Sequence, residues 1–396
     1  MNIYPKFRHY QLNNHSKGIG LVELMIAMVL GLILIAGIIE IYLSSKVAYR
    51  TIEEMARLQE NARYSMYQMQ KDIRMAGYSD CSPDIVNHLN PAGTNYDSSL
   101  FSLKEAVGGW EYSESTGTGP GSQYTITTLD PSGINIANWD DSDGSDLPLS
   151  LQNLVLSGTD VLTTKWLGNY ENVSVKNNNN INSVSINTNG ANNIPQYSIL
   201  LVTQDCNKAD LFQKLNNASS STVTRGAGAS TNPGPGNVNP NAIFGGGRKW
   251  STTYGPGAKF LAFNSNAYFI GQGDNDIPTL YRVSFSTGSA GTVEKVVEGI
   301  ENMQILYGED TDATPDGIAN IYHPMNAVTD GERVVSVRIS LLMRTIEPVS
   351  VDVDTKSDYQ MTGHSSATAT QIDPQDDRYL RYVFTSTIKL RNRGDL

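Results

Sequence analysis

A long apolar segment near the N-terminus constrains this chain more than any other feature of its sequence. Residues 19–39 are almost continuously apolar, which is about the length that a helix needs to cross a bilayer. Lys6, Arg8 and Lys17 precede the segment, and no acidic residue lies before it. Because positive flanks stay in the cytoplasm, the sequence predicts a single-pass inner-membrane protein with a cytoplasmic N-terminus and an outward-facing body.

One carboxylate, that of Glu23, lies inside the apolar segment. A charge at the centre of a bilayer costs about 2.5–3.5 kcal/mol on insertion scales, so an intramembrane acid usually has a function. The alternative is an acid near the membrane edge that is solvated by lipid headgroups. No convincing signal-peptidase site follows residue 39, so the apolar helix is expected to stay on the mature protein.

The helix is predicted to continue beyond the membrane. Residues 44–76 contain neither proline nor glycine, and their apolar residues recur at a spacing of three and four that is typical of an amphipathic helix. Charged residues, among them Glu54 and Asp72, fill much of the remaining surface. Gly77 is a suitable C-terminal stop. We expect the apolar stripe to pack on a sheet of the same chain, with packing against other helices of an assembly as an addition.

The pattern after Tyr78 changes to short β-type runs separated by Gly, Asn, Ser, Thr and Pro. This predicts an α+β protein, in which the long helix packs on an antiparallel β-sheet body with long loops. The low-complexity residues 216–247 are expected to form a flexible loop. The expected strands are residues 123–128, 161–167, 173–176, 183–187, 197–203, 259–264, 268–270, 280–285, 299–307, 334–342 and 379–390.

The composition argues against two classes of function. A formal net charge of -11 does not suit broad binding to nucleic acid, which needs a basic surface. The sequence contains no H-E-x-x-H arrangement, no metal-spaced Cys/His cluster and no G-x-S-x-G motif, so we predict that the chain is not an enzyme.

The chain has two cysteines, Cys81 and Cys206. If the body lies outside the cytosol, one disulfide between them is the natural interpretation. The alternative is two unrelated buried thiols.

The stretch from Lys17 to Met25 resembles the class III signal of type IV pilins and type II secretion pseudopilins. In that family the prepilin peptidase cuts after the glycine, here Gly18, and methylates the new N-terminus, here Ile19. The family glutamate, here Glu23, pairs with the N-terminal amine of a neighbouring subunit. The resemblance implies a type IV pilin-like fold with a leader (1–18), a transmembrane helix (19–39), a periplasmic continuation (40–77) and a β-rich periplasmic domain (78–396).

Further blocks resemble PilW-type minor pilins. They are residues 74–78 with Cys81, residues 157–162, 198–202, 205–212, 297–308 and 333–339, and the closing residues 385–393. The resemblance implies a minor pilin of the priming complex at the tip of the type IV pilus. Its implied partners are the major pilin, other minor pilins (V, X, E and FimU types) and a PilY-type tip adhesin. The alternatives are a J-like pseudopilin of type II secretion, or an adhesive module displayed at the tip.

One acidic segment suggests a calcium site. Asp310, Asp312, Asp316 and Asn320 offer hard oxygen ligands of the kind that Ca²⁺ binds in a tight loop. The segment resembles a family pattern with alternate acids, although two extra residues separate Asp312 from Asp316 and Asn320 replaces the last acid. The alternative is a turn rich in Asp and Gly between strands. No cofactor is otherwise expected, and a second run with Asp141, Asp143 and Asp146 is a weaker candidate.

Overall fold

Helix α1 (Leu21–Met75) is the first element of a computed structural model that describes residues 20–79, 84–93, 96–113, 123–126, 131–170, 173–204, 207–226, 233–288, 290–362 and 370–393. The chain divides into two compact units, one ending at Glu53 and the other beginning at Glu54. The described part of the first unit is therefore helical, whereas the second unit contains the C-terminal turns of α1 and all the described strands.

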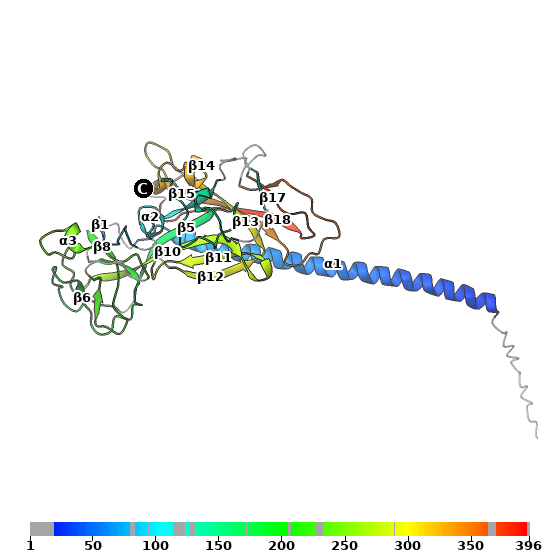
Figure 1. Cartoon of the computed structure of the whole chain (residues 1–396), viewed down its shortest axis with the longest axis horizontal. Helices are drawn as coiled ribbons and strands as arrows, with labels where there is room; N and C mark the ends of the chain where they lie inside the picture. Colours follow the sequence, from blue (N-terminus) through cyan, green and yellow to red (C-terminus); the bar gives the residue numbers. More distant parts are fainter. Residues whose placement is uncertain are drawn as a thin grey trace, which may run out of the picture. The chain divides into compact units, whose positions relative to one another are not determined.

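The larger sheet of the second unit has nine strands (Figure 1). Seven of them follow one another in the order β1-β8-β7-β10-β5-β2-β4, while β11 pairs with β10 and β12 pairs with β11. Their bounds are β1 (Asp84–Asn87), β2 (Val107–Tyr112), β4 (Trp139–Asp140), β5 (Val161–Asn169), β7 (Ile199–Thr203), β8 (Lys208–Gln213), β10 (Lys259–Gln272), β11 (Pro278–Ser284) and β12 (Thr292–Glu298).

The second large sheet has four strands in the order β14-β13-β15-β18, all antiparallel: β13 (Ile300–Glu309), β14 (Ile321–His323), β15 (Val334–Arg344) and β18 (Arg381–Lys389). Two small sheets consist of β16 (Tyr359–Gln360), β17 (Gln371–Asp373) and β3 (Gln123–Thr125), and of β6 (Ser185–Asn187) and β9 (Thr222–Thr224).

Short helical turns connect these strands. They are α2 (Ser98–Phe101), α3 (Pro240–Ile243) and the 3-10 turns η1 (Ile136–Asn138), η2 (Asp274–Asp276), η3 (Met325–Ala327) and η4 (Gly331–Arg333). Asp97 caps α2, because its carboxylate accepts a hydrogen bond from the Ser99 amide at 2.9 Å.

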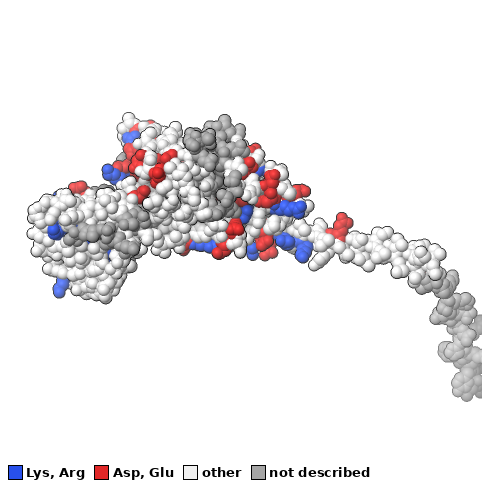
Figure 2. Space-filling view, viewed as in Figure 1, with Lys and Arg blue, Asp and Glu red and all other residues white. Residues whose placement is uncertain are grey.

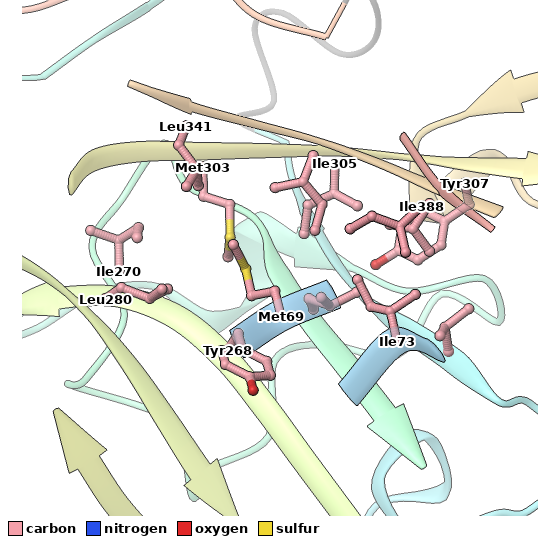
Figure 3. Close-up of a cluster of buried hydrophobic side chains, with 14 of the residues drawn as sticks. Met69, Ile73, Tyr268, Ile270, Leu280, Met303, Ile305, Tyr307, Leu341 and Ile388 are labelled. Atoms are coloured by element: carbon pink, nitrogen blue, oxygen red, sulfur yellow. The ribbon is translucent and has the colours of Figure 1, made fainter. Parts of the chain in front are cut away.

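The C-terminal half of α1 packs between the two large sheets (Figure 3). Met69 and Ile73 of the helix are fully buried, and they share one core with Tyr268 of β10 and with Met303 and Ile305 of β13. Burying an aliphatic side chain of this size contributes about 1.5–3 kcal/mol, so this part of α1 is held chiefly by its apolar stripe. The predicted packing of the long helix on an antiparallel body is confirmed.

Several details of the prediction are wrong. Residues 173–176 form no strand, since Val175 makes only an isolated bridge with Thr188. Residues 259–264 and 268–270 belong to the single strand β10. Two strand pairs, β1 with β8 and β3 with β17, are parallel. The described part of residues 216–247 contains β9 and α3.

Candidate functional site

Glu23 lies in the first turn of α1, where the Gly20 carbonyl accepts hydrogen bonds from the Glu23 and Leu24 amides at 3.0 and 3.1 Å. The most apolar window of this helix has a mean hydropathy of 2.8 and none of it is buried, so by length and composition it is able to cross a membrane. The predicted processing residues Gly18 and Ile19 lie outside the described residues. The structure thus describes an acid on a helix whose apolar surface is exposed.

Two acids of α1 that the sequence pattern placed on the helix surface are buried. Glu54 accepts hydrogen bonds from the backbone amides of Ile346 and Glu347 at 3.1 and 3.2 Å. Its other carboxylate oxygen lies 3.2 Å from the Arg57 guanidinium. A buried carboxylate needs such donors, and these come from a loop that is distant in sequence. Glu54 therefore fixes α1 against the loop that follows β15.

Asp72 is the second buried acid of α1. Its carboxylate accepts hydrogen bonds from the Asn266 amide group at 2.8 Å and the Tyr268 hydroxyl at 2.6 Å, both on β10. The Arg282 guanidinium of β11 lies 3.6 Å away. Hydrogen bonds to a charged group are directional, so Asp72 sets the rotation and height of the helix on the nine-stranded sheet.

The C-terminal end of α1 is closed by the end of the chain. The Asn392 side-chain amide lies 3.2 Å from the Ala76 carbonyl, one of the carbonyls that a helix end leaves unpaired. Gly77 has a φ of 74°, and a Cβ there would lie 3.0 Å from the Cβ of Ala106. Both features explain why glycine ends the helix, and Asn392 has a role that no local sequence signal indicated.

Cys81 and Cys206 lie outside the described residues, but their neighbours pair. Strands β1 and β8 are parallel, with Asp84 opposite Lys208. In addition, the Asp84 amide donates to the Asn207 carbonyl at 3.0 Å. The chain segments that follow the two cysteines therefore run side by side in the same direction.

The predicted calcium ligands come together only in part. Asp310, Asp312 and Asp316 each place one carboxylate oxygen within 4.8 Å of the others. The Asn320 side-chain oxygen instead accepts a hydrogen bond from the Thr311 amide at 2.7 Å. In the weaker candidate, Asp141 is buried and accepts hydrogen bonds from the Asp143 and Ser145 amides. Burial, with the neighbouring Asp143 side chain, raises the pKa of Asp141 to about 6.

His88, Asp210 and Ser251 lie together in the interior, but the serine does not contact the histidine as a nucleophile contacts its base. His88 Nε2 contacts Asp210, and the Ser251 hydroxyl also bonds Asp210, at 2.8 Å, rather than the histidine. His88 and Asp210 are fully buried and Ser251 is 5% exposed. A nucleophile must contact its base and be reachable by a substrate. The group therefore serves to hold the core around Trp250, which contacts the His88 ring edge-on.

Two stretches of the chain match known families. Residues 267–392 match the type IV pilus-assembly protein W, and residues 13–39 match the prokaryotic N-terminal methylation motif. A similar solved structure is the type IV-like pilin TTHA1219 from Thermus thermophilus, with 14% identity, a TM-score of 0.24 and coverage of 33% of this chain and 69% of that chain. A likeness of that size carries no argument about the fold. No curated protein sequence matches the chain.

Proposed function

We infer that this chain, a PilW-type minor pilin of the type IV pilus, acts in the complex at the pilus tip from which the filament grows. The observation that carries this proposal is the difference between the two ends of α1, of which one is exposed and apolar and the other is packed in the body. Its residues 21–39 expose an apolar surface with one acid, Glu23, whereas its C-terminal part is held in the body by its apolar stripe and by Glu54 and Asp72. Such a helix suits a subunit that inserts into a bundle of similar helices while its body stays outside.

The proposed partners follow from the family. They are the prepilin peptidase, the major pilin, the minor pilins of the V, X, E and FimU types and a PilY-type adhesin, and the body would face the periplasm before it reaches the pilus tip. The match with the pilus-assembly family favours this function over that of a J-like secretion pseudopilin. Pilins are structural proteins, which agrees with the prediction that the chain is not an enzyme.

Glu23→Ala tests the proposal. Losing one partner of a buried charge pair costs about 3–5 kcal/mol, so we expect incorporation of the variant into pili to fall by about tenfold or more. Surface pili would be counted by electron microscopy, and the variant would be quantified in sheared pili by immunoblotting. Glu40→Ala is the matched control, because it removes an exposed acid from the same helix. Normal incorporation of Glu23→Ala, at equal membrane levels, would contradict the proposed role of Glu23.

We also propose that Cys81 and Cys206 form the predicted disulfide. The support is the parallel pairing of β1 with β8, which begins three residues after one cysteine and two residues after the other. Strand neighbours lie about 4.8 Å apart, and each added residue extends the chain by at most about 3.8 Å. Segments of this length are able to bring two thiols together.

A second candidate function, an adhesive module at the tip, is favoured by the charge distribution. We define the polar lobe as residues 173–204, 207–226 and 233–258. Among these described residues the acid Asp210 is fully buried, and the charged side chains that reach the surface are the basic ones Lys176, Lys208, Arg248 and Lys249. Figure 2 shows few charged atoms over this lobe, around β6 and α3. The chain as a whole has a net charge of -11, so this surface would repel an anionic partner less than the rest of the protein.

A further inference from the structure

The loop between β13 and β14 contains the acids that imply calcium, and its donor set does not fit that ion. Asp310 is 1% exposed, and its carboxylate accepts three backbone amides: Asp312 at 3.2 Å, Asp316 at 2.8 Å and Gly317 at 2.7 Å. A carboxylate has about four lone-pair positions, so only one of those of Asp310 is left for an ion. Calcium takes six to eight oxygens, and the central acid of this loop is already engaged.

Two further side-chain oxygens of the loop are also engaged, whereas the Asp312 carboxylate lies within 4.8 Å of those of Asp310 and Asp316. Asp316 Oδ1 accepts the Ile318 amide at 2.9 Å, and Asn320 accepts the Thr311 amide. The amide hydrogens of Asp316 and Gly317 point at the Asp310 carboxylate. These two amides occupy lone-pair positions of Asp310 that an ion would otherwise use.

Arg333 contacts the acidic loop between β13 and β14 and brings a positive charge to it. Arg333 ends η4, and its carbonyl accepts the Asp310 amide at 3.0 Å, which holds the two residues together. Its guanidinium folds back over the loop and donates to the Asp312 carbonyl at 2.9 Å, with the Asp310 carbonyl at 3.4 Å. Arg333 Nε lies 3.8 Å from the Asp330 carboxylate.

We infer that Arg333 replaces the divalent cation in this loop, which is therefore closed and ordered without calcium. The guanidinium donates to the backbone carbonyls of Asp310 and Asp312, so a fixed positive charge closes the loop.

The first experiment compares the wild type with Asp312→Asn, both as full-length protein in detergent. Calcium would be titrated by calorimetry to about 1 mM, the weak end of extracellular sites, and melting temperatures would be measured with calcium and with a chelator. We expect identical titrations for the two proteins and no effect of the chelator. Saturable heat in the wild type that Asp312→Asn abolishes would overturn the inference.

The second experiment removes the proposed internal cation. In Arg333→Gln, amide hydrogen exchange at Asp316 and Gly317 is expected to accelerate about tenfold or more, because the loop opens more often. Lys389→Gln makes the same change of net charge at an exposed site on β18 and should leave exchange at these amides unchanged. Equal exchange in Arg333→Gln and in the wild type would overturn the inference. Should Arg333→Gln fail to fold, the comparison of the wild type with Asp312→Asn still decides.

Discussion

A pair of carboxyl groups between the two large sheets illustrates how single residues set the pH response of this protein. Asp160 is 2% exposed and accepts the Tyr112 amide at 3.1 Å and the Ile305 amide at 2.7 Å, which ties β2 to β13. Burial raises the pKa of Asp160 to about 7. Burial, and then the negative charge of Asp160, raises the pKa of its neighbour Glu111 well above the usual range. The pair is therefore most stable when it keeps a proton.

Both pKa values are higher in the folded than in the unfolded protein. The stability that the pair contributes is therefore complete below about pH 4 and is lost as the pH rises through about 7 and above. Glu111→Gln keeps a donor toward Asp160 without a proton that can be lost. We expect its melting temperature relative to the wild type to rise by about 2 °C or more between pH 5 and pH 8, since 1 kcal/mol corresponds to roughly 2–4 °C.

Differential scanning fluorimetry of the two full-length proteins across this pH range measures the difference. Glu347→Gln, at an exposed loop position, should follow the wild type at every pH. A difference between Glu111→Gln and the wild type that does not change with pH would show that the pair does not take up a proton on folding.

The residues that could be predicted from the sequence are those whose own surroundings in the sequence are unusual. Glu23 is conspicuous because apolar residues surround it on both sides. Glu54, Asp72 and Arg333 are not conspicuous, because charged residues on a helix or near a turn are common. Their partners lie on β10 and on loops far along the chain, and no local pattern encodes such partners.

At the scale of elements, the parallel pairing of β1 with β8 leads to the prediction for the cysteines. Peptide mapping without reductant should recover a cross-linked peptide that contains Cys81 and Cys206. Replacing both cysteines by serine should lower the unfolding free energy by about 2–5 kcal/mol, because a disulfide between them would close a long loop in the unfolded chain. Alkylation of both thiols in protein isolated from the cell envelope without reductant would contradict the prediction.

Helices and strands could be predicted where buried residues are regularly apolar. The prediction was wrong where polar groups are buried. The sequence predicts two strands in place of the 14-residue strand β10 because Ser265 and Asn266 interrupt its apolar run. In the structure Ser265 donates to the Leu100 carbonyl at 2.7 Å and Asn266 donates to Asp72. Polar residues that are satisfied by distant partners thus resemble a loop in the sequence. Strand β1, which pairs with distant β8, was missed for the related reason that its four residues carry little apolar pattern.

At the scale of the whole molecule, the two proposed functions, assembly and adhesion, would use different parts of the chain. In the proposed function, assembly would depend on α1 and its attachment to the body, whereas adhesion would depend on the polar lobe. Deleting residues 216–247 would not separate the two functions, because Val223 and Arg225 are fully buried in that segment. Substitutions of surface residues are therefore the better test.

The lobe variant carries Lys176→Ser, Lys208→Ser and Lys249→Ser, and its control carries Lys104→Ser, Lys356→Ser and Lys389→Ser elsewhere on the body. Both triple variants change the net charge equally, so a difference between them reports where the charge lies rather than how much there is. We expect both to form normal numbers of pili. If the lobe is adhesive, only the lobe variant loses attachment to a negatively charged surface, by about tenfold, since each exposed contact of this kind contributes up to about 1 kcal/mol. Equal attachment of the two variants, measured by counting adherent cells after washing, would remove the adhesive function and leave assembly as the role of this subunit.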